Sequence, residues 1–169
     1  MRVRHLLVPL VVSAVGVVAV QAAASAHDGH NNRHHGNRHD SAPLIKQDFT
    51  LTNDVNGNGG PVVASGAINA SGQDVVVSDT QDTFTFPDGS LTVFHAPVRS
   101  KDHFNEQKCT DTLRETGRYV IASGTGQYEG YSGSGEYLAT GRIENACENQ
   151  TPTGTINVTA RGSINIPSS

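Results

Sequence analysis

The 169-residue sequence has no tryptophan, one methionine and two cysteines, and its aromatic residues are four tyrosines and five phenylalanines. Basic residues are also few: 12 lysines and arginines stand against 16 aspartates and glutamates, a formal charge of −4. This balance excludes the basic surface expected of a nucleic-acid-binding protein. Alanine, glutamate, lysine, leucine and arginine do not dominate, so a coiled coil is not expected. Glycine is abundant, with 18 residues, which favours a β-rich protein.

The first 26 residues have the layout of a secretory signal peptide. Arg2 and Arg4 form a basic start, an apolar run covers 6–20, and residues 24–26 read Ala-Ser-Ala. The run is about 15 residues long, shorter than the roughly 20 that a spanning helix needs. We therefore expect residues 1–26 to be cleaved and the product to be secreted without a membrane anchor. Loss of the two arginines changes the formal charge from −4 to −6.

Secretion determines how the two cysteines are interpreted. Cys109 and Cys147 form an even pair, and paired cysteines in an oxidising compartment are most simply a disulfide. In the chain-entropy model, closing the loop between these two cysteines stabilises the fold by roughly 4 kcal/mol. The alternative, a catalytic thiol, would need a free sulfur beside a histidine.

Residues 27–43 are predicted to form a disordered arm, because they offer little apolar surface to bury. Neutral imidazoles on such an arm can bind Zn, Cu or Ni, so the arm is a candidate metal site, although adventitious affinity or pH-dependent charge is the simpler interpretation. Its histidines are His27, His30, His34, His35 and His39. After cleavage, the amine and ring of His27 could also chelate copper together. The sequence predicts no other cofactor.

From residue 44 onward, alternating apolar residues between turn signals are typical of short β-strands. The clearest hairpin joins 83–86 to 91–94 through Pro87 and Gly89. The other β-prone runs are 44–53, 62–68, 75–77, 118–123, 135–143 and 153–166. Glycines within strands permit the coiling that closure requires. Residues 44–169 are therefore predicted to form one all-β domain, a sandwich or, preferably, an antiparallel barrel.

Other possible sites in this domain are less specific. The segment Asp54-x-Asn56-x-Asn58-Gly59 matches the opening of a calcium loop, but Ser65 replaces the bidentate glutamate, so a hairpin turn is preferred. The domain contains two histidines, at positions 95 and 103, and each is interpreted as structural. No catalytic residue can be assigned from these patterns.

The most distinctive stretch runs from Gly117 to Gly135. It contains Gly-Thr-Gly-Gln-Tyr-Glu-Gly over 124–130, followed by glycines at 133 and 135. This segment resembles the G-[ST]-G-x-[FY]-x-G-x-x-G signature of plant allene oxide cyclases and, more loosely, of dirigent proteins. Secreted bacterial proteins with allene oxide cyclase barrel-like domains are more similar still. The resemblance implies a barrel of about eight strands with a largely apolar cavity.

The resemblance also implies a function. Plant cyclases of this family guide an unstable epoxide to one stereoisomer by confining it, and related plant proteins are often trimers. The implied ligand-binding residues are Asn53, Tyr119, Tyr128 and Glu129, with packing favoured over ligand contact for Tyr128. The carboxylate expected on the first strand falls on Leu51, which is apolar and counts against cyclase activity itself.

Two functions from different classes remain. The first is a secreted allene oxide cyclase-like barrel that binds a small apolar ligand, with its action on that ligand, isomerisation or cyclisation, left open. The second is a non-enzymatic extracellular binding module whose histidine-rich arm captures metal. A copper enzyme built on His27 ranks third.

Overall fold

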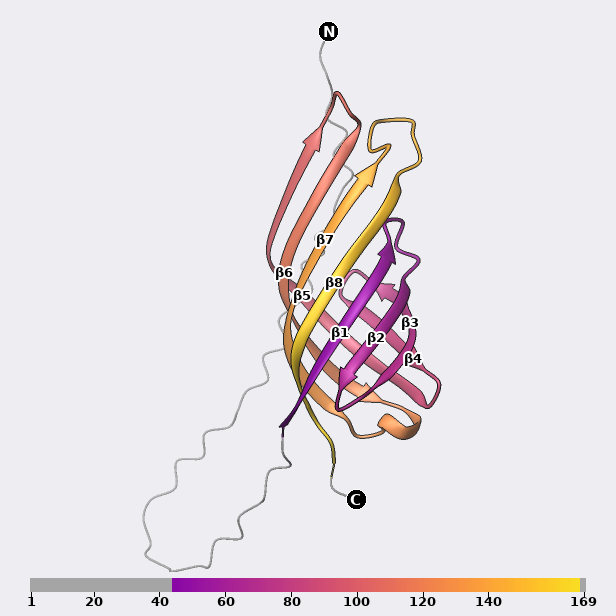
Figure 1. Cartoon of the computed structure of the whole chain (residues 1–169), viewed down its shortest axis with the longest axis vertical. Helices are drawn as coiled ribbons and strands as arrows, with labels where there is room; N and C mark the ends of the chain where they lie inside the picture. Colours follow the sequence, from indigo (N-terminus) through magenta and orange to yellow (C-terminus); the bar gives the residue numbers. More distant parts are fainter. Residues whose placement is uncertain (1–43, 168–169) are drawn as a thin grey trace, which may run out of the picture. The chain divides into compact units, whose positions relative to one another are not determined.

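The computed structural model describes residues 44–167, which form eight antiparallel strands and one short 3-10 helix (Figure 1). The elements are β1 Leu44–Asp54, β2 Gly60–Gly66, β3 Ala70–Ser78, β4 Gln81–Phe86, β5 Gly89–Asn105, β6 Thr110–Gly124, η1 Gly126–Tyr128, β7 Ser132–Glu144 and β8 Thr153–Asn165. The predicted signal peptide and histidine-rich arm lie outside the described residues. Within those residues, no helix has the length and apolar character needed to cross a membrane.

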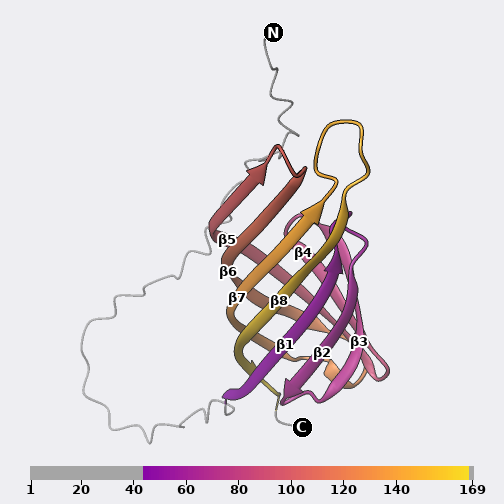
Figure 2. The same ribbon diagram turned by 45° about the horizontal axis from the view of Figure 1, so that its top comes forward.

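The strands pair in sequence order, and β1 also pairs with β8, which closes the barrel. This last pairing is continuous from Leu44, opposite Asn165, to Asp54, opposite Thr155. Figure 2 shows the tilt of the strands as they wind around the barrel. The predicted all-β fold, a single antiparallel barrel of about eight strands, is therefore confirmed.

The two ends of the barrel differ in their connections. We call the end that carries the β1–β2, β3–β4, β5–β6 and β7–β8 connections the upper end, which is uppermost in Figure 1. Four strands, β5 to β8, continue beyond the others there as a projecting sheet. The alternating pattern missed much of this sheet, because 95–105 and 110–117 are rich in polar and charged residues. Pro97 is tolerated in β5 because the β4 pairing ends at Phe94.

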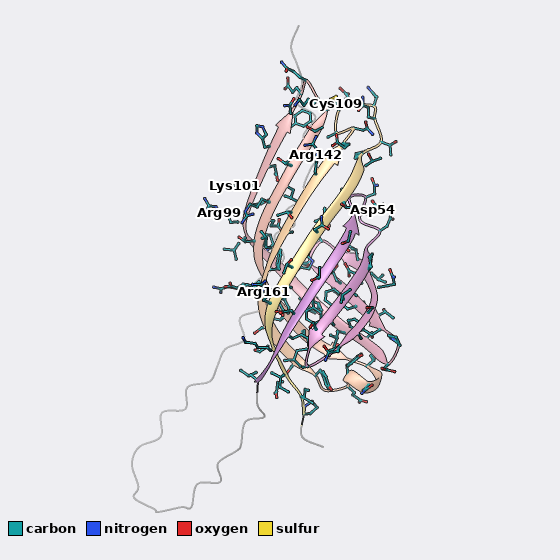
Figure 3. All side chains as sticks on the ribbon, viewed as in Figure 1. Asp54, Arg99, Lys101, Cys109, Arg142 and Arg161 are labelled. Carbon is teal, nitrogen blue, oxygen red and sulfur yellow. A yellow bond between two sulfur atoms is a disulfide. The ribbon has the colours of Figure 1, made fainter. Side chains whose placement is uncertain are left out.

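A disulfide ties the projecting sheet together. Cys109 follows β5 and Cys147 follows β7, and their sulfur atoms are bonded with the Cα atoms 4.9 Å apart. The backbone N–H of Ala146 donates to the Cys109 carbonyl oxygen (2.8 Å) beside the bridge. Figure 3 marks Cys109 at the tip of this sheet. The predicted pairing is thereby confirmed.

The lower end of the barrel is filled by side chains. Leu91, Val62 and Ile164 are completely buried there, and Tyr128 of η1 packs edge-on against Phe86 with ring centroids 5.7 Å apart. Gln47 is also completely buried: its amide nitrogen donates to the carbonyl oxygens of Asp48, Ser65 and Ile68, and its amide oxygen accepts from the Ile68 N–H (2.7 Å). This end is closed by packing and a satisfied amide.

Two glycines make room for tyrosine rings on the inner wall. The Tyr119 ring from β6 lies against Gly135 of β7, and the Tyr137 ring from β7 lies against Gly117 of β6. A Cβ atom at either glycine would collide with the ring. Gly117 and Gly135 therefore serve to accommodate aromatic side chains inside the barrel.

Candidate functional site

The barrel contains a cavity of about 230 Å³ in its upper part. Every strand except β2 contributes to its lining, through the inward-facing residues that alternate along each strand. Its apolar lining residues are Phe49, Leu51, Val76, Phe84, Val93, Leu113, Tyr119, Ala139, Ile156, Val158 and Ala160. Its polar and ionisable lining residues are Asn53, Ser78, Asp79, Asp82, His95, Glu115 and Tyr137. The cavity is thus mostly apolar, with polar groups concentrated towards the upper end.

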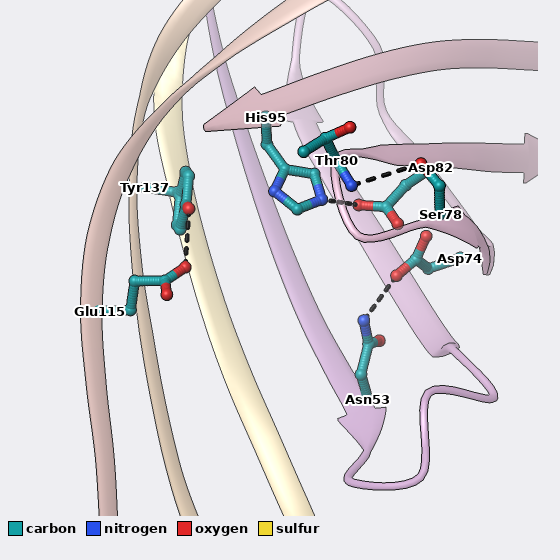
Figure 4. Close-up of polar contacts among 8 residues, drawn as sticks. All are labelled: Asn53, Asp74, Ser78, Thr80, Asp82, His95, Glu115 and Tyr137. Atoms are coloured by element: carbon teal, nitrogen blue, oxygen red, sulfur yellow. Dashed lines mark hydrogen bonds and ion pairs between the residues drawn. The ribbon is translucent and has the colours of Figure 1, made fainter. Parts of the chain in front are cut away.

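Three polar pairs lie in this part of the barrel (Figure 4). In the first, His95 Nε2 lies 3.3 Å from Asp82 Oδ2. The two residues come from β5 and β4, which are adjacent. The pKa of His95 is raised, chiefly by its hydrogen bond to Asp82, with burial acting in the opposite direction. This pair places an oriented imidazole on the cavity wall.

In the second pair, the Tyr137 hydroxyl donates to Glu115 Oε1 (2.8 Å). Burial, reinforced by the neighbouring Glu115 carboxylate, raises the pKa of Tyr137, so its phenol keeps its proton in ordinary buffers. The Tyr137 ring meets the His95 ring edge-on, with centroids 5.9 Å apart. The His95–Asp82 and Tyr137–Glu115 pairs therefore lie side by side on the cavity wall.

In the third pair, Asn53 Nδ2 donates to Asp74 Oδ2 (2.6 Å). The strands β1 and β3 are not adjacent, but Gly60 of β2 pairs with Asp74 and carries no side chain between them. Asp74 is only 2% exposed, and this burial, with the nearby Asp82 charge, raises its pKa to about 6. Asn53 Oδ1 and Asp74 Oδ1 are buried and have no hydrogen-bond partner among the described residues.

The structure brings together two of the residues implied by the resemblance. Asn53 and Tyr119 both line the cavity, as does the apolar Leu51. The Tyr119 ring meets Phe49 edge-on, and burial raises its pKa to about 12. Tyr128 and Glu129 are not among the lining residues: Tyr128 is buried in the packed lower end, and Glu129 is exposed. The metal-binding histidines proposed for the arm lie outside the described residues.

Sequence reasoning missed most of the polar groups in the cavity. His95 was interpreted as a structural histidine, and Asp74, Asp82, Glu115 and Tyr137 were not singled out as a group. One signal was present: Leu91, Val93 and His95 alternate along β5, which places the imidazole on the inner face. Which carboxylate it meets depends on the pairing register.

The loop that resembles a calcium site is a hairpin turn. The backbone N–H of Asn56 donates to Asp54 Oδ1 (2.6 Å), which lowers the pKa of that carboxyl. Gly57 and Gly59 adopt positive φ angles, and the Asp54 N–H donates to the Gly59 carbonyl oxygen (3.1 Å). Across residues 44–167, no cluster of three or more histidine, cysteine, aspartate or glutamate side chains is arranged to hold a metal ion.

The comparisons with known proteins leave the site to be interpreted from its own geometry. Comparisons with protein-family models, curated proteins and solved structures gave no significant match to this chain. The fold and the site define a small closed β-barrel that has one packed end and a mostly apolar cavity near the other end.

Proposed function

We propose that this protein is a secreted β-barrel that binds a small, mainly apolar molecule in its upper cavity. The observation that carries the proposal is the contrast between a lower end filled by side chains and an upper part that encloses about 230 Å³. Ligand sites in proteins are typically concave and apolar with a few placed polar groups, and this cavity has that composition.

The cavity volume limits the size of the ligand. An engineered apolar cavity of about 150 Å³ is large enough to hold benzene. A cavity of about 230 Å³ therefore suits a molecule of roughly naphthalene size, or one end of a longer molecule. The aromatic rings of Phe49, Phe84 and Tyr119 would contact its apolar part, while Asn53 and His95 would contact a polar substituent.

Secretion is part of this proposal. The disulfide is compatible with an oxidising compartment, and the sequence begins with the layout of a signal peptide. The resemblance to allene oxide cyclases adds that the barrel would guide an isomerisation or cyclisation by confining the ligand. Leu51 occupies the position expected for the family carboxylate and lines the cavity, so any chemistry would require other side chains.

The experiment is a fluorescence titration of the purified protein with 1-aminonaphthalene, whose emission changes when it enters an apolar site. Ala160 lines the cavity, and Ala160→Leu places a larger side chain within it. We expect this variant to weaken binding at least about tenfold, a loss of about 1.4 kcal/mol. Thr159→Leu, on the outward-facing neighbour of the same strand, is the matched control and should bind like the parent protein.

Far-ultraviolet circular dichroism would establish that both variants are folded. Equal affinity of the parent and Ala160→Leu would contradict binding in this cavity, as would the absence of any saturable binding to the parent. Should Ala160→Leu fail to fold, Ala139→Leu tests the same cavity from β7.

A further inference from the structure

The position of His95 within the cavity is fixed from several directions. Its backbone N–H donates to the Thr80 carbonyl oxygen (3.0 Å), and the Thr80 N–H donates to Ser78 Oγ (3.3 Å) at the β3–β4 turn. Its ring is held between Asp82 on one edge and the ring of Tyr137. These contacts hold the imidazole of His95 in a fixed orientation on the cavity wall. The cluster is drawn in Figure 4.

We propose that His95 is a general base that moves a proton within a ketone bound in the cavity, with Asp82 as its positioning residue. The proposal rests on the ligand binding proposed above and names a substrate class for it: a small, apolar β,γ-unsaturated ketone. The site residues implied by the family resemblance include neither His95 nor Asp82.

The carboxylate of Asp82 determines which imidazole nitrogen can act. Asp82 accepts a hydrogen bond from Nε2, so the neutral ring carries its proton there and Nδ1 has the free lone pair. No described residue makes a hydrogen bond to Nδ1, and in Figure 4 this nitrogen faces the side of the cavity where Tyr137 lies. His95 thus presents a basic atom to the cavity, beside Tyr137.

The proton transfer is balanced without any further reagent. Nδ1 takes a proton from the carbon between the carbonyl group and the double bond, and the electron pair of that C–H bond moves through the carbonyl to its oxygen, which gives a dienolate. The imidazolium then returns the proton to the γ carbon, the oxygen's electron pair re-forms the carbonyl, and the double bond is left in conjugation. No atom is gained or lost, and nothing is oxidised or reduced.

The dienolate oxygen needs a hydrogen-bond donor, and Tyr137 supplies a phenol on the neighbouring wall. Its hydroxyl donates to Glu115, and in the proposed step it donates to the dienolate oxygen instead. A positioned donor that acts on charge developing in a low-dielectric site is a major source of catalysis. The base, His95, and the donor, Tyr137, line the same cavity, and their ring centroids are 5.9 Å apart.

The charged groups around His95 set the direction of its pH dependence. Asp82 on β4, Asp74 on β3 and Glu115 on β6 all raise the pKa of His95, whereas burial lowers it. Asp79, in the β3–β4 turn, also lines the cavity, and Tyr137 on β7 is a neutral neighbour. The basic form of His95 therefore predominates only above its raised pKa, and the rate should increase with pH until that value is passed.

The test uses cyclohex-3-en-1-one, whose conversion to the conjugated enone is followed by ultraviolet absorbance. We expect saturable conversion by the parent protein and a loss of about 100-fold in kcat/KM for His95→Gln, the lower limit for a general base. His103→Gln is the matched control, since His103 lies exposed on the projecting part of β5, and it should retain the parent rate.

The role of Asp82 has its own readout. Asp82→Asn should lower kcat with little change in KM, and it should move the inflection of the pH–rate profile to lower pH because the main cause of the raised His95 pKa is removed. A purely structural aspartate would leave the inflection unchanged, and that result would overturn its positioning role.

Binding and chemistry can fail separately. If 1-aminonaphthalene binds but the parent converts the ketone no faster than His95→Gln, the proton-transfer proposal is overturned and ligand binding stands. If neither is detected, both proposals are overturned. Should His95→Gln lose its fold, His95→Phe replaces it, because a phenylalanine ring can keep the edge-on contact with Tyr137 but has no basic nitrogen; retention of the parent rate by that variant would overturn the proposal.

Discussion

Gln47 and Asn53 are two amide side chains on the same inner face of β1, yet their surroundings are opposite. Gln47, at the lower end, makes four hydrogen bonds to backbone groups and is completely buried. Asn53, at the cavity, makes one hydrogen bond, and its Oδ1 has no partner among the described residues. The lower end has the features of a stabilising core, whereas the upper part retains unsatisfied polar groups around an open space.

The largest expected difference between the two ends concerns leucines. Leu91 is completely buried at the lower end, so Leu91→Ala should lower the free energy of unfolding by about 4 kcal/mol. Leu113 is only partly buried and lines the cavity, so Leu113→Ala should cost about 1 kcal/mol, because little tight packing is lost. Urea denaturation with an unchanged m-value measures both. Equal losses would mean that the two ends are equally packed.

The second difference tests the two amides directly. Gln47→Leu leaves the Ile68 N–H without its partner, and we expect a loss of about 3 kcal/mol in unfolding free energy. Asn53→Leu removes an amide that makes only one hydrogen bond. We expect it to lower the free energy of unfolding by less than about 1 kcal/mol at pH 5, where Asp74 is mostly protonated. A loss for Asn53→Leu as large as that for Gln47→Leu would remove the contrast between the ends.

The lower end was the more predictable from the sequence. Period-two alternation identified the strands that hold Gln47, Phe86 and Leu91, and the turn at Pro87 lies where its residues indicated. The disulfide at the opposite, upper end was also predictable, because it follows from counting the cysteines. These features depend on local pattern or on chain-wide composition, and they do not require knowledge of which residue faces which.

The polar cavity residues could not be paired in this way, because they meet diagonally across strands. Asp82 lies opposite Val93, and its hydrogen-bond partner is His95, two residues further along β5. Glu115 lies opposite Ala139, and its partner is Tyr137. Register decides such diagonal neighbours, and β5 contains two irregularities in its pairing with β6 that no sequence pattern located.

The smallest expected effect comes from the buried carboxyl at the cavity. The pKa of Asp74 is about 6, raised mainly by burial from an ordinary value of 3.8, so the native state binds more protons than the unfolded state between these values. We therefore expect stability to fall as the pH rises from about 4 to about 6, by about 2 to 3 kcal/mol, and then to remain level with respect to this group.

Asp74→Asn removes this pH dependence of stability, and it can also give the amide oxygen of Asn53 a hydrogen-bond partner. An asparagine at this position accepts from Asn53 Nδ2 through its oxygen, and its amide nitrogen can donate to Asn53 Oδ1, which has no partner now. We expect the variant to be more stable than the parent by about 2 kcal/mol at pH 7.5 and nearly equal to it at pH 4, by urea denaturation. Asp102→Asn, at an exposed position of β5, should shift neither value. A destabilised Asp74→Asn at pH 7.5 would instead mean that the ionised carboxylate contributes to stability, and the cavity end would then resemble the lower end in having its polar groups satisfied.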